Sequence, residues 1–301
     1  MDVIFAEIIL DEEDKIISKK DLINDGFDCE IFVNKIRFSN NLKLKKDNQI
    51  IYIFKNKCKN LSNMFCGCSL LKSIDISNYN SSNVTLMNNM FRDCSNLSSI
   101  NLSNFNTSDV INMNCMFSNC SKLTSIDLSS FNTGNVIEIG WMFYNCSSLI
   151  SLDLSNFNIN KITNMNSMFY NCSKLKSIII SNFNNNNQID MGGMFLGCSS
   201  LSSINMNKFH INNIRNMGSM FNGCSSLTSI DLSNFRTNNI NEMGYMFNNC
   251  SSLISLDLSN FNIDNKISMV KMFSGCHKLK IENVKFKDSK IKSQLILDLK
   301  I

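Results

Sequence analysis

Cysteine is the residue whose number and spacing most invite a chemical role in this chain. Thirteen cysteines occur in 301 residues, and nine of them recur at intervals of 26 residues. Thiolates bind soft metals or pair as disulfides, and stacked turns would lie about 4.8 Å apart, inside the Cα range of a disulfide. The periodic set is Cys68, Cys94, Cys120, Cys146, Cys172, Cys198, Cys224, Cys250 and Cys276.

A packing role fits these nine cysteines better than metal binding or pairing. Each stands alone in its repeat, their number is odd, and equivalent side chains of stacked turns point along parallel vectors. Histidine occurs only at His210 and His277, and no paired C-x-x-C array is present. Free cysteine behaves as a small buried hydrophobe. We therefore predict reduced, inward-facing thiols and no metal or other cofactor, and we leave open the roles of Cys66 and Cys115, which break the pattern.

Acidic residues form a second column with the same spacing. It contains five aspartates, with Asn101, Ile179 and Asn205 at the equivalent places of other repeats. Carboxylates on neighbouring strands repel one another, so the column is either a cation site, a docking strip for a basic partner, or a solvated face softened by serines. The solvated face is favoured over a cation site, and the docking strip stays open. The aspartates are Asp75, Asp127, Asp153, Asp231 and Asp257.

Catalysis has little support in the sequence. No nucleophile has a histidine and an acid beside it in the repeat pattern, and two histidines leave little general acid–base chemistry at neutral pH. Repeated units also make repeated surfaces rather than one distinct pocket. The sequence therefore predicts that the protein is not an enzyme and has no catalytic residues.

The elements that must position these residues are read from one repeat. A Met-Phe pair recurs every 26 residues from Met64 to Met272, and Leu71, Ile74 and Ile76 show the L-x-x-I-x-I spacing of a short strand with alternate residues inward. An aromatic follows the strand, as Phe157 does, and the steps of three and four among the next apolar residues suit a short helix. The fold class predicted is α/β: a leucine-rich-repeat solenoid of about nine 26-residue turns, with a parallel sheet on one face and short helical or irregular returns on the other.

The amino-acid sequence of the repeat resembles that of a known family. Segments such as "MFNGCSSLTSIDLSNF", which begins at Met220, resemble the BspA-like leucine-rich repeat proteins, a 26-residue surface-protein repeat family. The resemblance covers about residues 58–282. It implies a solenoid without catalytic activity, and display on a cell surface with binding of host or matrix proteins. The chain departs from the family's pattern in having no proline and no evident signal peptide or anchor.

The chain divides into three parts. Residues 1–57 do not repeat, and "VIFAEIIL", "EIFVNKIRF" and "QIIYIFKN" read as strands of a β-rich N-terminal cap. Residues 58–282 form the solenoid. Residues 283–301 form a basic C-terminal cap or tail, in which "KIKSQLILDLK" is expected to give a final strand.

Charge and hydropathy limit the classes of partner that the sequence predicts. The net charge is +4 without a dense basic face, so nucleic acid is not expected as a partner. No apolar run approaches the ~20 residues that a membrane helix needs. Without an evident signal peptide or anchor the expected location is cytoplasmic, with the cell surface as the alternative.

Two functions follow from these observations. The first is a non-enzymatic scaffold that binds a protein partner through the exposed sheet face, and the alternative is a cell-surface adhesin that binds host or matrix proteins. The residues predicted to contact the partner are Ser73, Asp75, Asn101, Ser125, Asp127, Ser151, Asp153, Asn205, Ser229, Asp231, Ser255 and Asp257.

Overall fold

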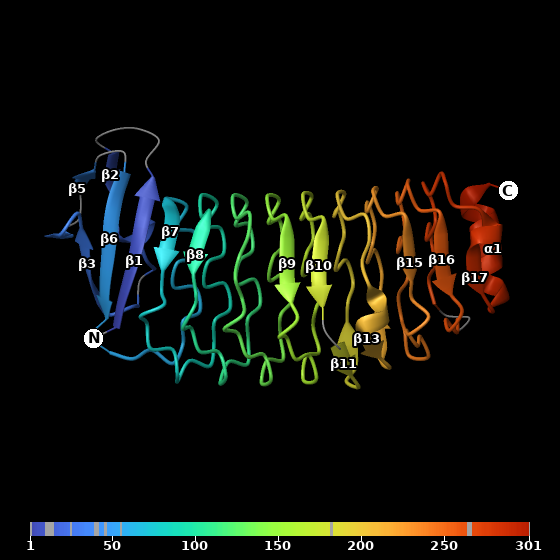
Figure 1. Ribbon diagram of the computed structural model, residues 1–301, viewed down its shortest axis with the longest axis horizontal. Coiled ribbons are helices and arrows are strands. Elements are labelled where there is room, and N and C mark those ends of the chain that lie inside the picture. The colour runs from blue at the N-terminus through green and yellow to red at the C-terminus, as the bar shows by residue number, and fades with distance from the viewer. Residues whose placement is uncertain are drawn as a thin grey trace.

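The chain winds into an elongated stack of turns, with strands at the N-terminal end and a helix at the C-terminal end (Figure 1). The computed structural model describes residues 2–9, 15–24, 26–38, 42–44, 47–54, 56–180, 183–263 and 267–300. Neighbouring strands pair in parallel at a separation of 26 residues, as Ser73 does with Ser99 and Ser151 with Ser177. The predicted leucine-rich-repeat solenoid is thereby confirmed.

The strands are short, and most of each turn is irregular. Within the described residues the elements are β1 (Asp2–Ile9), β2 (Lys15–Ile17), the 3-10 helix η1 (Lys19–Asp21), β3 (Cys29–Val33), β4 (Ile36–Arg37), β5 (Leu42–Leu44), β6 (Asp47–Phe54), β7 (Leu71–Asp75), β8 (Ser99–Asn101), β9 (Ser151–Leu154), β10 (Ser177–Ile180), β11 (Phe183–Asn185), β12 (Ile189–Asp190), η2 (Met206–Lys208), β13 (Phe209–Ile211), β14 (Ile214–Asn216), β15 (Ser229–Asp231), β16 (Ser255–Leu258), η3 (Ile281–Asn283), β17 (Val284–Phe286) and α1 (Ser289–Leu299).

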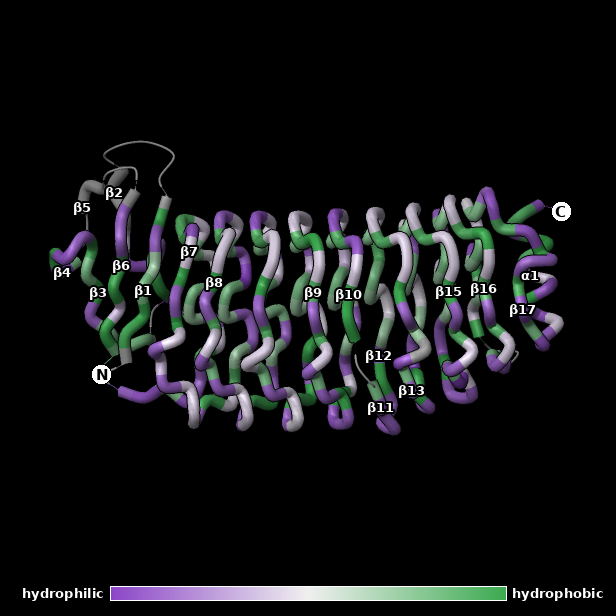
Figure 2. Tube along the Cα trace, in the orientation of Figure 1, coloured by the Kyte–Doolittle hydropathy of each residue, from purple (hydrophilic) through white to green (hydrophobic). Residues whose placement is uncertain are grey.

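The main ladder runs along one side of the stack. Strands β7 and β8, β9 and β10, and β15, β16 and β17 pair in parallel. Turns without an assigned strand also belong to the stack. For example, the Thr124 carbonyl of one such turn accepts the N–H of Ile150 from the next turn at 3.1 Å. Hydropathy alternates along each turn (Figure 2), as expected when one set of side chains fills the core and the other faces outward.

The returns are irregular, not helical. Their backbone N–H groups alternate between two targets: Met64 N donates to Leu61 O within its own turn at 3.2 Å, and Phe65 N donates to Met90 O of the next turn at 2.9 Å. Half of the amides therefore close tight turns while the others hold neighbouring turns together. Of the two predicted forms of the return, the irregular one is confirmed and the short helix is wrong, because in a helix all of these amides would bond within their own turn of the solenoid.

Two residues of each return adopt left-handed backbone angles. One precedes the Met of the Met-Phe pair and the other precedes the periodic Cys, as Asn89 (φ 57°) and Asp93 (φ 61°) do. The position before Cys is always Gly, Asn or Asp, the residues that tolerate this conformation best. The position before Met varies more and includes Cys115 and Trp141. Cys115 thus occupies a variable position of the return and is only half-buried.

Two aromatic columns fill the core. The phenylalanines of the Met-Phe pairs, from Phe65 to Phe273, stack with ring centroids 5.5 to 6.0 Å apart and planes within 12° of parallel. The column that follows the strand is also buried, and its rings are tilted, as between Phe105 and Phe131. Each ring of the Met-Phe column packs on the rings of neighbouring turns, so no single repeat can bury its own core.

The periodic cysteines are buried and point inward, as predicted. All thirteen cysteines of the chain are free, and the nine periodic ones are at most 1% exposed. The Cys94 thiol donates to the Phe65 carbonyl of the preceding turn at 3.0 Å, and the same carbonyl accepts the Cys68 N–H at 3.0 Å. Equivalent thiol contacts of 3.0 to 3.2 Å recur to Cys276. Cysteine is therefore both a small apolar filler and a donor that links turns.

The N-terminal strands continue the solenoid sheet. Strand β1 pairs antiparallel with β7 and places Ala6 opposite Ile74, which gives a sheet in the order β4-β3-β6-β1-β7-β8. Carbonyls of the first return have no preceding turn to supply donors. Asn24 supplies them: its N–H donates to Met64 O at 2.9 Å, and its side-chain amide donates to the carbonyls of Asn63 and Cys66.

The C-terminal end differs from the expected final strand. The segment "KIKSQLILDLK" lies mainly in helix α1, whose N-cap Asp288 accepts from Lys290 N. Strand β17 takes the last place in the sheet instead, with Val284 opposite Leu256. That register is two residues beyond the 26-residue step, because η3 is inserted before β17. Glu282, which the period would place inward, is exposed.

Candidate functional site: the outward face of the sheet

The predicted contact residues lie on the outward side of the main ladder. Ser125, Asp127, Ser151, Asp153, Asn101, Asn205, Ser229, Asp231 and Ser255 are exposed, and Ser73, Asp75 and Asp257 are half-exposed. Backbone pairing sets Asp75 beside Asn101 and Asp231 beside Asp257. We call the column from Asp75 to Asp257 the outward strip. It is interrupted at Ile179, which pairs with Asp153 and is 58% exposed.

A lysine lies at the C-terminal end of the strip, and the sequence interpretation did not identify it. Because η3 shifts the register, Lys285 rather than a residue 26 places after Asp257 pairs with that aspartate. The Lys285 ammonium lies 3.3 Å from Asp257 Oδ2. Aligning the inward pair Leu256 and Leu258 with Val284 and Phe286 would have revealed it. Lys285 therefore offsets the charge of Asp257, while Asp231 on the preceding turn stays exposed.

Each aspartate of the strip closes a local turn. Oδ1 of Asp127 accepts the N–H of Ser129 at 2.9 Å, and Asp153, Asp231 and Asp257 do the same with the serine two residues on, at 2.8 to 3.0 Å. Asn101 makes an equivalent bond to Ser103 N at 3.2 Å. The Asp-x-Ser spacing is therefore a turn-forming motif at the end of the strand.

Three aspartates of the strip have lowered pKa values. Hydrogen bonds from the backbone and then the hydroxyl of Ser129 lower the pKa of Asp127. For Asp75, burial opposes the shift, but hydrogen bonds from Ser77 and Asn101 lower its pKa overall. Burial likewise opposes the lowered pKa of Asp257, which Ser259 and Lys285 outweigh. Within the described residues no group of three or more His, Cys, Asp or Glu side chains could hold a metal ion.

A hollow opens at the N-terminal end of the strip. It has a volume of about 590 Å³ and lies where β6, β1, β7 and β8 run side by side. Phe5, which is 44% exposed, and Ile51 form its apolar wall, while the small outward side chains of Ser73 and Ser99 leave space beside them. Its lining also includes Glu7, Lys35, Gln49, Asp75 and Asn101.

The sequence interpretation missed this hollow. It named Ser73, Asp75 and Asn101 but no residue of the N-terminal strands. The alternation in "VIFAEII" places Phe5 on one face of its strand, which is the available signal. The neighbour of Phe5 is Asp75, and that pairing depends on β1 docking antiparallel on β7.

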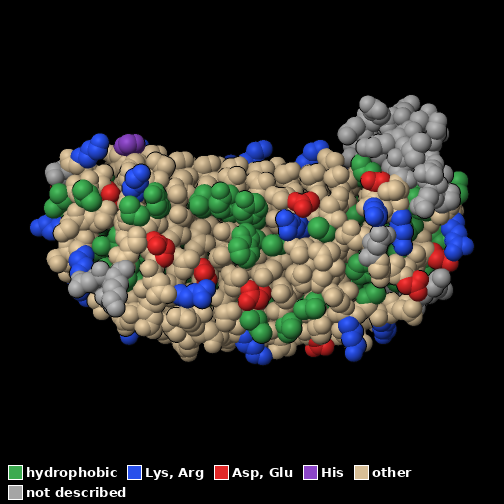
Figure 3. Space-filling view, turned by 180° about the vertical axis from the view of Figure 1, so that it is seen from behind, with side chains coloured by type: hydrophobic (Ala, Val, Ile, Leu, Met, Phe, Trp, Pro, Cys, Tyr) green, Lys and Arg blue, Asp and Glu red, His purple; other side chains and the backbone are tan. Residues whose placement is uncertain are grey.

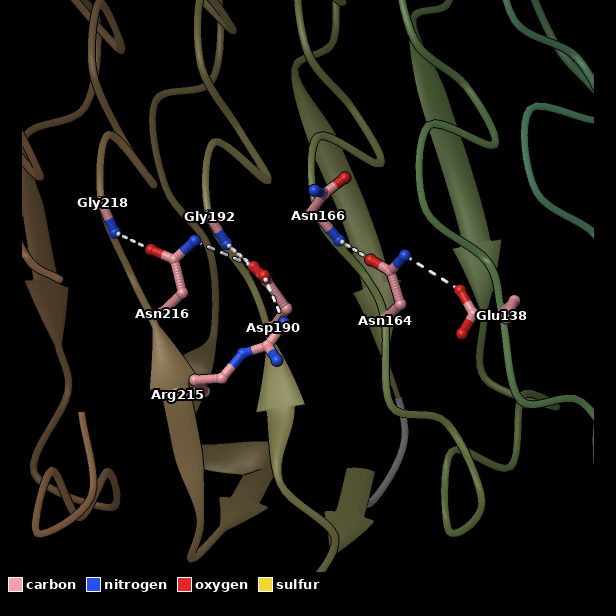
Figure 4. A network of polar contacts seen from close by, with 8 residues as sticks. All are labelled: Glu138, Asn164, Asn166, Asp190, Gly192, Arg215, Asn216 and Gly218. Carbon is pink, nitrogen blue, oxygen red and sulfur yellow. Dashed lines mark hydrogen bonds and ion pairs between the residues drawn. The ribbon is translucent and has the colours of Figure 1, made fainter. Parts of the chain in front are cut away.

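A second polar column runs along the returns. Amide and carboxylate side chains alternate from Asn112 through Glu138, Asn164, Asp190 and Asn216 to Glu242, and their backbones form parallel bridges. Figure 4 shows the centre of this column: Asn164 donates to Glu138 Oε2 at 2.9 Å and accepts from Asn166 N at 3.0 Å. Asp190 accepts from Asn216 at 3.1 Å and pairs with Arg215 at 3.1 Å. Alternation keeps like charges apart, so we assign this column to stability.

The surface seen from behind is mostly neutral. Figure 3 shows backbone and uncharged polar side chains over most of that side, with lysines, arginines and acids dispersed among them. Exposed apolar side chains of the chain include Ile111 (43%) and Ile137 (41%), which are neighbours on successive turns. Among the described residues, no helix combines the length and apolar character that crossing a bilayer requires.

These features define a leucine-rich-repeat-type solenoid protein with a polar, acidic sheet face. The model of the family described as "Mycoplasma protein of unknown function, DUF285" matches residues 35–151, 59–183, 139–253 and 189–294 in overlapping stretches. The chain belongs to this family.

Comparison with other proteins adds little to this assignment. No curated protein matches the chain. A chain in the crystal structure of a TLR13–ssRNA13 complex is 17% identical, with 75% of this chain and 41% of that chain covered and a TM-score of 0.26. The match therefore spans less than half of the TLR13-complex chain, and a similarity this low carries no argument about function.

Proposed function

We propose that the protein is a non-enzymatic scaffold that binds a protein partner through the outward strip. The observation that carries the proposal is the run of aspartates along one ladder of stacked turns, each held by its own Asp-x-Ser turn. Side chains that are already ordered lose little freedom on binding. The strip is thus suited to an extended segment that makes many polar contacts.

The charge of the strip favours a basic partner. Asp127 and Asp153 lie on successive turns without a basic residue between them in the column. Opposite charge speeds encounter and discriminates against acidic competitors more than it adds affinity. Nucleic acid is disfavoured by the same argument, because its phosphates would meet carboxylates.

A binding role also agrees with the placement of the histidines. His210 lies in β13 and His277 follows the last periodic Cys, and both are exposed. Neither belongs to the outward strip or to the lining of the hollow. The proposal therefore includes no catalytic residue and no cofactor.

The alternative is a cell-surface adhesin that uses the same strip. It is supported by the resemblance of the repeat sequence to BspA-like proteins. That resemblance implies display on the cell surface and binding of host or matrix proteins. The two functions share the surface and differ in where the partner is met. Protease treatment of intact cells, followed by detection of the chain, separates them, because only the adhesin is cleaved before lysis.

The test of the binding surface uses the quadruple variant Asp127→Asn, Asp153→Asn, Asp231→Asn and Asp257→Asn. Asparagine keeps the turn, as Asn101 does with Ser103, and removes the charge. Proteins that co-purify with the wild type from the native cells should be lost or reduced with this variant, more strongly at low salt.

A matched control separates position from charge. The double variant Asp127→Asn/Asp153→Asn is compared with Asp109→Asn/Glu282→Gln, which removes two exposed carboxylates outside the strip. The control should retain the partner and the strip variant should not. Equal recovery with a folded strip variant would place binding elsewhere on the molecule.

A further inference from the structure

The hollow beside the strip has a chemistry that the strip lacks. Its wall is apolar, formed by Phe5 of β1 and Ile51 of β6, which face each other across the antiparallel pair. Phe5 is a large apolar side chain that is 44% exposed. An apolar surface beside a polar, rigid face is the arrangement of an anchoring pocket for one side chain.

The depth of the hollow follows from the sizes of neighbouring side chains. Along one row of the sheet the outward residues are Phe5 and Asp75, and along the next they are Glu7, Ser73 and Ser99. The two serines are too short to fill the space beside Phe5. Lys35, from the turn between β3 and β4, lines the hollow as well and can cover it with its methylene stem while the ammonium stays in water.

Charge indicates what lies next to the anchor. Asp75 borders the hollow, and the strip continues with Asn101, Asp127 and Asp153 on the following turns. The hollow therefore opens onto a run of carboxylates. A segment anchored in it and running along the strip would meet these carboxylates with basic side chains.

We propose that the hollow receives an aliphatic or aromatic side chain of an extended basic peptide segment of the partner. This inference rests on the proposed function and specifies the partner. Turns are about 4.8 Å apart and an extended peptide advances about 3.3 Å per residue. Asp127 and Asp153 lie two and three turns beyond Asp75, so lysine or arginine is expected about three to five positions from the anchor.

The experiment begins with a displayed library of random dodecamer peptides, selected on the full chain. Enriched peptides should share one large apolar residue and a basic residue about three to five positions away. Synthetic fluorescent copies are then titrated against the wild type and variants. Ser99→Tyr fills the hollow, Phe5→Ser removes its wall, and Ser202→Tyr makes the first change at an exposed serine outside both the hollow and the predicted contacts.

The expected result is a loss of about tenfold or more in affinity with Ser99→Tyr and with Phe5→Ser, and little change with Ser202→Tyr. Replacing the apolar residue of the peptide by serine should weaken binding similarly. Thermal unfolding of each variant establishes that it is folded. Ser99→Tyr fills the hollow and Phe5→Ser removes its wall, so one variant still tests the inference if the other is unstable.

Other outcomes overturn the inference and are distinguishable from failure of the proposed function. Peptides that depend on Asp127 and Asp153 but tolerate Ser99→Tyr would remove the hollow from the site and leave the strip. Peptides that tolerate changes in both places would contradict both. If no peptide is enriched, the peptide anchor is wrong while the co-purification test still stands. A wild-type dimer that Ser99→Tyr converts to a monomer, measured by light scattering, would identify the occupant as a second copy of the chain.

Discussion

The carboxylate of Asp298 accepts the backbone N–H of Phe273 at 2.9 Å. In every earlier turn the equivalent amide donates to the Met carbonyl of the next turn, as Phe247 N does to Met272 O at 2.9 Å. The last turn has no successor, and helix α1 supplies an oxygen in its place. Asp288 does the same for Ile263 N at 2.9 Å. A short helix thus ends the solenoid by offering acceptors to its last unpaired donors.

Asp298→Ala should therefore loosen the last turn. The Phe273 amide belongs to a fully buried residue, and a buried donor left without an acceptor costs about 1–3 kcal/mol. Hydrogen exchange should quicken in residues 267–280 and remain unchanged near the first turns. Asp298→Asn keeps an acceptor oxygen and should stay close to the wild type. Equal loss in both variants would mean that charge, not the acceptor, matters.

Asn24→Ala should have the mirror effect at the other end. Its side chain donates to the carbonyls of Asn63 and Cys66. In the next turn the carbonyl equivalent to that of Cys66 accepts from the preceding turn, as Arg92 O does from Gly67 N at 2.7 Å. Removing it takes this donor from the Cys66 carbonyl, whereas the Asn63 carbonyl still accepts the Cys66 N–H at 3.0 Å. We therefore expect a loss of about 1 kcal/mol, felt in the first return only. Asn56→Ala, at an exposed asparagine nearby, is the control. A wild-type denaturation midpoint for Asn24→Ala would contradict the capping role.

The buried thiols of the nine periodic cysteines should be unreactive toward thiol reagents in the native protein. Burial raises the pKa of Cys146 from its ordinary 9.0 to about 12, and burial likewise raises the pKa of Cys224 to about 12. A disulfide reagent at pH 8 should label the half-buried Cys58, Cys66 and Cys115 first. After unfolding under non-reducing conditions all thirteen thiols should react. Thiols that remain blocked in the unfolded chain would show that they are not reduced.

The same shift predicts loss of stability in alkali. A thiol whose pKa is raised by folding favours the folded state fully below its unfolded pKa, and this contribution is lost as pH rises through the folded value. With Cys146 and Cys224 moving from 9.0 to about 12, the free energy of unfolding should fall steadily above about pH 9. Denaturant midpoints between pH 7 and 11 measure this. Cys146→Ala should reduce the slope.

Phe157→Ala tests the tilted aromatic column. Phe157 is 3% exposed, and loss of a buried aromatic typically costs about 3–5 kcal/mol. In a stack of repeats the damage should fall on the neighbouring turns. Hydrogen exchange in β9 and β10 should rise more than in β16. A thermal unfolding curve that matches the wild type would contradict a core role for this ring.

The period of the sequence determined most of the inward architecture. Columns of Leu, Ile, Met, Phe or Cys that persist through most repeats were expected to face the core, because equivalent residues of stacked turns share one environment. The form of the returns was harder to predict. Steps of three and four arise in a helix, but they also arise when successive tight turns alternate with bonds such as Phe65 N to Met90 O. Those bonds join residues 25 apart, and no local pattern reveals them.

The structure of the ends of the solenoid and the position of the hollow could not be predicted from the sequence, for a related reason. The run "QLILDL" is short enough to suit a strand or a helix, and it forms part of α1 because β17 already takes the last place in the sheet. The outward strip followed from alternation along each strand. The hollow required knowledge of how β1 pairs with β7, and the register Phe5 to Asp75 is set by tertiary packing rather than by a repeat.

The alternation of amide and carboxylate along the returns gives the last prediction. Asn164 lies between Glu138 and Asp190, donates to Glu138 Oε2 at 2.9 Å and accepts from Asn166 N at 3.0 Å. Asn164→Asp keeps the acceptor, loses the donor and sets three carboxylates on successive turns. We expect a loss of about 1–3 kcal/mol at pH 7, from the broken bond and the repulsion between like charges.

The pH and salt dependence identify the cause. Repulsion raises the pKa of the new carboxyl in the folded state, so its cost is absent below its unfolded pKa and grows as pH rises through the folded value. Denaturant midpoints of Asn164→Asp should thus approach the wild type at low pH, and salt should recover part of the loss. Asn132→Asp is the matched control: Asn132 makes the same kind of turn with Gly134 N at 3.0 Å, but its column neighbours are Asn106 and Asn158. An equal loss in both variants would mean that any carboxylate in such a turn is unfavourable, and alternation would not be the reason for the pattern.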